Sequence, residues 1–251
     1  MRFLFPDKGG KAVKLLLIRH AEPADDGGLT EKGKREAELL AERISFLPVS
    51  AFYVSPLQRA AETAEPILQK TGRKADTLDW LREFEIPTAK PDWETLSPVP
   101  WNWLPEDWLA EARFLSAEHW QENEIFRSAG VGEAYKNVIT AFDAFLSEHG
   151  YIREGRAYRA CRANTDTLAL VTHFGLSCVL MSHLFNCSPM ILWHSLMMAP
   201  SSVTTIFTEE RQEETVIFRA AAIGDVSHLT AAGEEPSSAG RFAETYINEE
   251  H

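Results

Sequence analysis

The chain has few of the features that mark secreted scaffolds or membrane proteins. Its 251 residues include three cysteines, Cys161, Cys178 and Cys187. An odd set without metal-type pairing is typical of reduced thiols in a cytoplasm, not of a disulfide framework. The longest apolar stretch, Leu168 to Leu184, is broken by polar residues and falls short of the roughly 18 apolar residues that a transmembrane helix needs. We therefore predict a soluble, cytoplasmic protein that does not bind membranes.

Positive charge is scarce as well. Lysine and arginine total 25 against 37 aspartates and glutamates, which gives a formal net charge of −12. The chain lacks the global positive field of a general nucleic-acid binder, so nucleic acid is not an expected partner. Any anion must instead be held by a local positive pocket.

Signals for cofactors, metals and export are also missing. No glycine-rich nucleotide loop is present, and no cluster of His, Cys, Asp or Glu has zinc or calcium spacing. The first 14 residues carry lysines and glycines where a secretory signal would need a continuous apolar core. We expect no cofactor, no metal and no export.

What the chain does have is the pattern of a large α/β domain. With 45% hydrophobic and 25% charged residues, it has ample material for a buried core. Short apolar runs without polar alternation are typical of buried parallel strands, and helix signals follow them. The runs are 13–18, 51–54 and 167–172; the helices begin at Thr30 and Pro56 and cover 176–185; two further strands, predicted as antiparallel neighbours, are 203–208 and 215–222. We expect a three-layer αβα sandwich around a mostly parallel central sheet.

One segment departs from this pattern. Between Pro87 and Gly130, five tryptophans lie among prolines and acids, and residues 92–124 contain eight acids and a single Lys or Arg, Arg113. Two interpretations stay open: tryptophans pin an irregular segment to the body of the protein, or they form a wall that selects the substrate. We predict a single domain over 1–251, with its core at 13–229, an insertion or lid at 87–130 and a flexible tail at 230–251.

Polar residues that end the apolar runs are the candidates for chemistry. Arg19 and His20 end the first run, Arg59 lies in the first turn of the helix after the second, and His173 ends the third. Ligands of open parallel sheets bind beyond the carboxyl ends of the strands, so these four side chains should converge. Together with the N-terminus of the helix at Pro56, they would suit a dianionic phosphate.

These residues lie in segments that resemble the signatures of the histidine phosphatase superfamily, the phosphoglycerate mutase-like proteins with an Arg-His-Gly motif. Six segments match in the family's order: Leu16 to Glu22 at the Arg-His signature, Leu29 to Gly33, Ser55 to Ala64, Leu81 to Glu83, Val171 to Gly175 and Gly224 to Leu229. They cover the chain from about Leu15 to Leu229.

The resemblance implies a mechanism. His20 would be the nucleophile that carries the phosphoryl group, and Arg19, Arg59 and His173 would hold the phosphate oxygens. Glu83 would act as acid and base, with Glu85 as the less favoured rival. The implied activity is that of a metal-independent phosphoric monoester hydrolase of the histidine acid phosphatase type, which takes a small phosphate ester and releases inorganic phosphate.

Two departures from the family pattern limit the resemblance, and the second makes mutase activity the less favoured alternative. Ala21 replaces the signature glycine, which is tolerable where φ is negative. Residues Pro23 to Asp26 lack the phosphate contacts of the mutase branch. A phosphoglycerate-type mutase and a catalytically silent phosphate-binding or interaction module stay as alternatives. His228 is expected near the pocket, the other histidines are expected to be structural, and the oligomeric state stays open.

Overall fold

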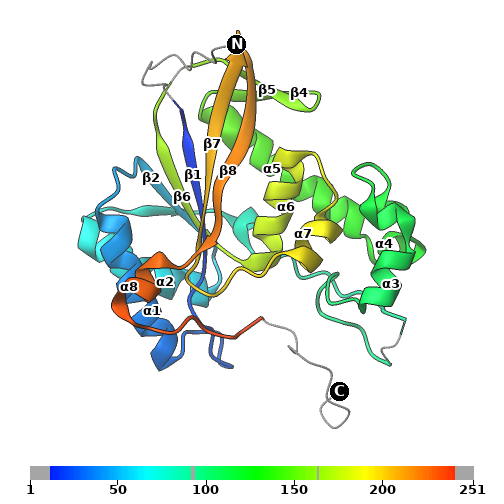
Figure 1. Ribbon diagram of the computed structural model, residues 1–251, viewed down its shortest axis with the longest axis horizontal. Helices are drawn as coiled ribbons and strands as arrows, with labels where there is room; N and C mark the ends of the chain where they lie inside the picture. Colours follow the sequence, from blue (N-terminus) through cyan, green and yellow to red (C-terminus); the bar gives the residue numbers. More distant parts are fainter. Residues whose placement is uncertain (1–11, 92–93, 163, 241–251) are drawn as a thin grey trace, which may run out of the picture.

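Eight strands in the described residues form one central sheet. The computed structural model describes residues 12–91, 94–162 and 164–240. The sheet has the order β3-β2-β6-β1-β7-β8-β5-β4 (Figure 1). Its strands are β1 (Lys14–Arg19), β2 (Ala51–Val54), β3 (Ala75–Thr77), β4 (Tyr151–Glu154), β5 (Ala157–Ala160), β6 (Thr167–Thr172), β7 (Val203–Gln212) and β8 (Thr215–Asp225). The five strands predicted from the sequence correspond to β1, β2, β6, β7 and β8.

The sheet is mixed, so the expectation of a mostly parallel sheet is wrong. Strands β3, β2, β6 and β1 are parallel to one another. From β1 outward, the β7, β8, β5 and β4 pairings are all antiparallel. The cause is local, because β7–β8 and β4–β5 are joined by two-residue turns, and such short connections join only antiparallel strands.

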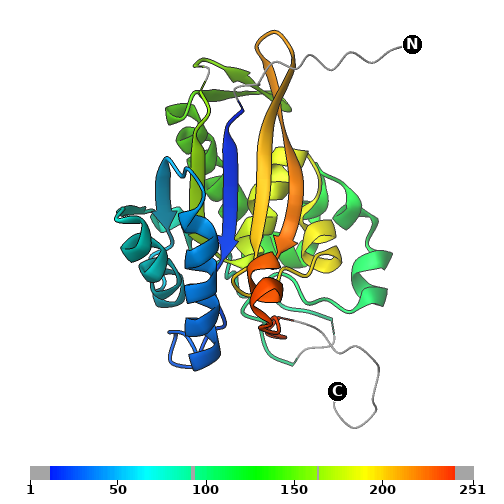
Figure 2. The ribbon, with the colours of Figure 1, turned by 60° about the vertical axis from the view of Figure 1, so that its left-hand side comes forward.

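Helices cover both faces of the sheet and give the predicted three layers. Helices α1 (Glu31–Ser45), α2 (Gln58–Thr71) and α8 (Ser227–Ala232) lie on one side, and α5 (Val131–Glu148), α6 (Phe174–Phe185) and α7 (Pro189–Ser195) on the other (Figures 1 and 2). Successive residues of β1 serve the two cores in turn, as the two-residue period of a strand requires. Leu16 and Ile18 pack in the α1–α2 core, while Leu15 and Leu17 pack in the opposite one.

The tryptophan-rich insertion contains short helices and no long strand in its described part. It holds α3 (Pro105–Ala110), α4 (Glu124–Ala129) and two 3-10 turns, Ala112–Leu115 and Trp120–Glu122; a further 3-10 turn, Asp79–Leu81, precedes it. Trp101 and Trp120 are buried, and both rings contact Trp193 of α7, which lies outside the insertion. Tryptophans therefore do pin this segment to the body; Trp93 lies outside the described residues.

The segment after α8 follows the protein surface as far as it is described. Helix α8 extends to Ala232, and Ser237 is only 2% exposed, with its hydroxyl hydrogen-bonded to the Glu22 carboxylate. Residues 230–240 thus do not form the free tail expected from their composition, because Ser237 supplies a buried polar contact that composition does not reveal. The rest of that prediction, 241–251, lies outside the described residues. Among the helices described, none combines the length and apolar character needed to cross a membrane.

Candidate active site

His20 lies where β1 ends, and backbone hydrogen bonds fix it there. Its N–H donates to the carbonyl of Thr172 (2.9 Å), and its own carbonyl accepts from Ser201 N–H (3.0 Å). The imidazole Nδ1 lies 2.8 Å from the Ala21 carbonyl oxygen, so Nδ1 carries the proton. Nε2 is then unprotonated, and its lone pair accepts a hydrogen bond from Arg59 Nε–H at 3.3 Å. This tautomer points an unprotonated nitrogen towards Arg59.

Burial and positive neighbours keep His20 neutral. The side chain is 4% exposed, and burial together with the charges of Arg19 and Arg59 lowers its pKa to about 3. A neutral imidazole with an accessible lone pair is the form that can act as a nucleophile.

His173 lies beside His20, at the point where β6 gives way to α6. The two ring centroids are 5.0 Å apart. Burial, together with the charges of the neighbouring His20, Arg59 and Arg19, lowers the pKa of His173 to about 2. Its Nε2 lies 2.7 Å from Ser55 Oγ, while its buried Nδ1 has no hydrogen-bond partner within the described chain.

Ser55 has a different role from the one the sequence suggested. The Ser-Pro pair predicted an N-cap with a helix opening at Pro56, but α2 begins at Gln58, and its N-cap, Leu57, has no side-chain cap. The Ser55 hydroxyl instead orients His173 and accepts the Leu57 N–H at 3.3 Å. The sequence analysis missed this contact, because a Ser-Pro pair predicts a helix cap from local residues alone, and His173 lies 118 positions away in the chain.

Two arginines flank the histidines from different elements. Arg19, from the end of β1, donates through Nη1 to the carbonyls of Met198 (2.5 Å) and Ala239 (3.4 Å). Its Nε is buried and finds no partner within the described residues. Arg59 comes from the first turn of α2, as predicted. The pair supplies positive charge to a sheet edge in an otherwise acidic protein.

The two candidate carboxylates lie in different surroundings. Glu83 follows the 3-10 turn and accepts N–H groups at the start of α6, from Gly175 (3.2 Å) and Leu176 (2.8 Å), as well as from Phe84 (2.8 Å). Burial nevertheless raises the pKa of Glu83 above its ordinary value. The Glu85 side chain is 54% exposed, and its Oε1 lies 3.5 Å from Arg59 Nη2.

A pocket of about 250 Å³ opens beside this cluster. It is lined by Arg19, Glu83, Trp101, Asn102, Phe174, Trp193, Leu196, Met198 and Gly240. Arg19 and Glu83 are the charged members of this lining, and the tryptophan-rich insertion contributes Trp101 and Asn102. The insertion therefore serves both as a pinned segment and as a wall of the pocket.

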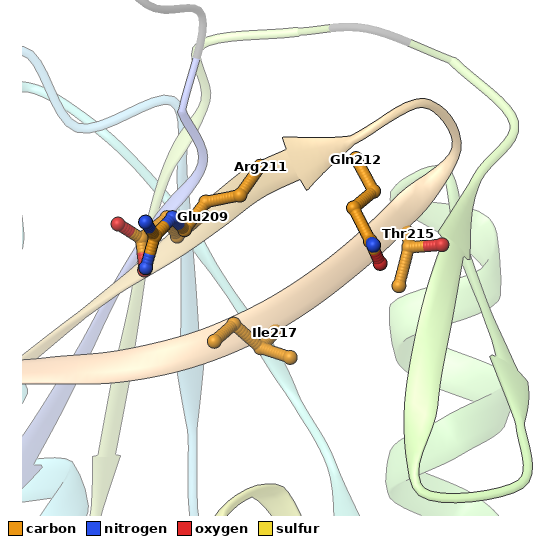
Figure 3. Close-up of a pocket in the computed structure, with 5 residues that line it drawn as sticks. All are labelled: Glu209, Arg211, Gln212, Thr215 and Ile217. Carbon is orange, nitrogen blue, oxygen red and sulfur yellow. The ribbon is translucent and has the colours of Figure 1, made fainter. Parts of the chain in front are cut away.

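Another hollow, of about 400 Å³, lies far from these residues. It follows the end of the β7–β8 hairpin and is lined by Glu209, Arg211, Gln212, Thr215 and Ile217 (Figure 3). Strand register places this end of β7 beyond Lys14, whereas Val203 pairs with Ile18 next to His20. The hollow thus lies at the opposite end of the sheet and contains none of the predicted site residues.

Ala21 and His228, the other residues predicted at this edge of the sheet, have defined contacts in the structure. Ala21 is not among the described residues with positive φ, and its N–H donates to Thr63 Oγ1 (2.9 Å), so the methyl group causes no backbone strain. His228 Nε2 lies 3.2 Å from Ser201 Oγ, and Ser201 in turn binds the His20 carbonyl. His228 is therefore two contacts from His20, while His119, His149, His183 and His194 bond to protein groups elsewhere.

Sequence comparisons agree with this arrangement. A family model described as the histidine phosphatase superfamily (branch 1) matches residues 15–220. Phosphoserine phosphatase 1 of Hydrogenobacter thermophilus is 37% identical over 84 residues, which span 30% of this chain and 37% of that protein. A 2,3-bisphosphoglycerate-dependent phosphoglycerate mutase of Thermoplasma acidophilum is 33% identical over 86 residues, spanning 30% and 43%. These matches cover less than half of either relative.

Solved structures share the fold over most of their length. A phosphoserine phosphatase from Entamoeba histolytica superposes with a TM-score of 0.54 and 20% identity, covering 86% of this chain and 99% of that one. A mycobacterial glucosyl-3-phosphoglycerate phosphatase gives a TM-score of 0.53 and 20% identity, covering 85% and 99%. At these identities the likeness concerns the fold alone.

Proposed function

The chain belongs to the histidine phosphatase superfamily, and we propose that it hydrolyses small phosphate monoesters through a phosphohistidine on His20. The observation that carries the proposal is the state of His20. Its Nε2 is an unprotonated acceptor that contacts Arg59 beside a second neutral imidazole, and the positive charge of Arg19 acts on the same ring. Such a cluster suits a phosphate dianion and presents a nucleophile to it.

In the first step, His20 Nε2 attacks phosphorus as the bond from phosphorus to the ester oxygen breaks. Negative charge on the transferred group is spread over its equatorial oxygens. Arg19 and Arg59 are placed to hold those oxygens, and so is the unpartnered Nδ1 edge of His173 once it carries a proton. Their contribution is electrostatic stabilisation in a site largely shielded from water.

The departing alkoxide needs a proton, which we assign to Glu83. Burial raises the pKa of this carboxyl group, which favours the protonated form that a general acid requires. In the second step, water attacks the phosphohistidine, the phosphorus–nitrogen bond breaks, and Glu83 takes the proton from the water. Glu85 is the weaker candidate, because it lies on the solvent side of Arg59.

Hydrolysis is favoured over mutase transfer by the loop after the signature. Residues 23–29 close on themselves through a bridge between Pro23 and Leu29 and a hydrogen bond from Ala24 N–H to the Gly28 carbonyl (2.9 Å). The tip of this loop carries Asp25 and Asp26, both exposed. Carboxylates repel a phosphate, so this loop offers no second anion contact to retain a product for phosphoryl return.

Trapping the intermediate tests the proposal. The purified protein is mixed with a phosphate ester labelled on phosphorus, in the presence of EDTA, and is quenched in alkali, which preserves phosphohistidine. We expect turnover and label on His20, both lost in His20→Ala and both kept in His119→Ala, a control at an exposed histidine paired with Glu122. Turnover that persists in His20→Ala would refute the mechanism, and turnover abolished by EDTA would refute its metal independence.

A further inference from the structure

We propose that the pocket beside Glu83 takes an uncharged aromatic or bulky apolar leaving group, so that the substrates are phosphate esters of such alcohols rather than of hydroxy acids. This inference rests on the proposed phosphatase function and on the assignment of Glu83 as its acid. It concerns the part of the substrate that departs, which the cluster around His20 does not select.

The position of Glu83 decides which part of the substrate enters the pocket. A general acid must come within hydrogen-bond reach of the oxygen that it protonates. That oxygen joins phosphorus to the leaving group, so the leaving group must lie next to the Glu83 carboxyl. Glu83 borders the 250 Å³ pocket, with Arg19 next to the phosphate site on the same lining. The pocket is therefore the leaving-group site.

The walls of this site are aromatic and apolar. Trp101 is 8% exposed, and its ring centroid lies 6.0 Å from that of Phe174 in an edge-on contact and 5.4 Å from that of Trp193. Leu196 and Met198 complete the apolar lining, and Asn102 adds one neutral polar side chain. Rings bind well between such walls, since aromatic pairs gain energy beyond their buried area.

The charges in the lining disfavour an acidic leaving group. Arg19 uses Nη1 for two backbone carbonyls, and the proposed function assigns its remaining donors to the phosphate, so it has none left for a second anion. A carboxylate on the leaving group would then lie near Glu83 without a cation of its own, and an unpaired buried charge is costly. Phosphorylated hydroxy acids and amino acids should therefore be poor substrates.

The aromatic wall is held rigidly in place. A Cβ added to Gly175 would lie 2.0 Å from Trp101 Cη2, so the indole lies directly on this glycine. The loop after Trp101 is fixed by Trp103, whose N–H donates to His194 Nε2 (3.2 Å) and whose Nε1–H donates to the Pro100 carbonyl (3.0 Å). At about 250 Å³, this preformed pocket lies just below the usual size range of ligand sites and fits a single ring rather than a nucleoside.

A matched pair of esters tests the proposal with the unmodified protein. Benzyl phosphate and 4-carboxybenzyl phosphate have closely similar leaving oxygens and differ by one carboxylate. We expect kcat/KM to be roughly tenfold or more higher for benzyl phosphate, because a carboxylate left without a partner costs at least that much. Equal or faster turnover of the carboxylated ester would overturn the inference and leave the phosphatase function intact. Absence of turnover and of phosphohistidine with either ester would overturn both.

Variants in the wall locate the effect. Trp101→Ala should raise KM for benzyl phosphate several-fold with little change for methyl phosphate, whose leaving group is too small to reach the wall. Trp108→Ala is the matched control, since Trp108 belongs to the same insertion but stacks on His194 outside the pocket lining. Leu196→Lys keeps the aromatic wall and adds a cation, and it should shift the preference towards 4-carboxybenzyl phosphate. This assignment of the pocket is wrong if Trp101→Ala leaves KM for benzyl phosphate unchanged and Leu196→Lys leaves the preference for benzyl over 4-carboxybenzyl phosphate unchanged.

Discussion

Replacing Glu83 by glutamine removes one proton donor and leaves most of the site in place. Two of the three N–H groups that Glu83 accepts, from Phe84 and Leu176, go to Oε1, which glutamine retains. The third and longest, from Gly175 at 3.2 Å, goes to Oε2, which becomes an amide nitrogen and can no longer accept it. We expect the free energy of unfolding to fall by about 1–3 kcal/mol, the cost of one unsatisfied buried group.

Activity should fall far more than stability. General acid catalysis contributes roughly 10²–10⁴-fold to rate, so Glu83→Gln should lose about 3–5 kcal/mol of transition-state stabilisation with benzyl phosphate. With 4-nitrophenyl phosphate, the departing phenolate is stable without a proton, and the loss should be much smaller. The assay compares kcat/KM for the two esters at a temperature where both proteins are folded by circular dichroism.

Glu85→Gln is the matched control. Glu85 is two residues away, and its exposed ion pair with Arg59 is worth at most about 1 kcal/mol. We expect less than about a fivefold change in kcat/KM with either ester. If Glu83→Gln keeps benzyl phosphate activity within tenfold while Glu85→Gln loses it, the assignment of the acid is wrong and the roles are exchanged.

Three further predictions concern pH, phosphate and packing. The pKa values of about 3 for His20 and about 2 for His173 lie below the unfolded value near 6.5. The unfolded chain therefore binds more protons than the folded protein below about pH 6.5. The free energy of unfolding should fall as the pH drops from about 6.5 towards 3. Urea unfolding at pH 7 and 5 measures the fall, which should be smaller in His173→Asn; an equal fall would show that His173 is not the source. Inorganic phosphate should stabilise the folded protein by about 2.7 kcal/mol at a hundred times its Kd, which a rise in Tm measures. Arg59→Met should abolish most of that rise; an unchanged rise would remove Arg59 from the phosphate site. Gly175→Ala should cost about 1–3 kcal/mol in urea unfolding, because the added methyl group would lie 2.0 Å from Trp101, and a neutral effect would mean that Trp101 moves freely.

The sequence predicted those parts of the fold that depend on patterns close together in the chain. The runs at 51–54 and 167–172 became β2 and β6 with the same bounds, because polar or turn-forming residues stand directly outside each apolar run. The hairpin of β4 and β5 was not anticipated. Its strands have four residues each and are only partly buried, so they show neither a long apolar run nor a clear alternation.

The site was predictable to a similar extent. Arg19, His20, Arg59 and His173 were placed together by the rule that strand ends meet at one edge, and the structure brings them together. The contact of Ser55 with His173 spans 118 positions in the chain, and that of Ala239 with Arg19 spans 220. Nothing local in the sequence marks such contacts, since a serine or an alanine fits many surroundings.

The hydrogen bonds of Glu83 limit what the start of α6 can contribute to the proposed phosphate site. The sequence had assigned a helix N-terminus to the phosphate at the helix opening at Pro56, which is α2 in the structure and begins at Gln58. In the structure, the N–H groups of Gly175 and Leu176 at the start of α6 are taken by the Glu83 carboxyl group. Those two N–H groups are therefore not available to a phosphate, and on this side of the proposed site the arginines and imidazoles are left as its ligands. On the proposed assignment of Glu83 as the acid, the start of α6 serves proton transfer by holding that carboxyl group, while the charged side chains serve the phosphoryl group.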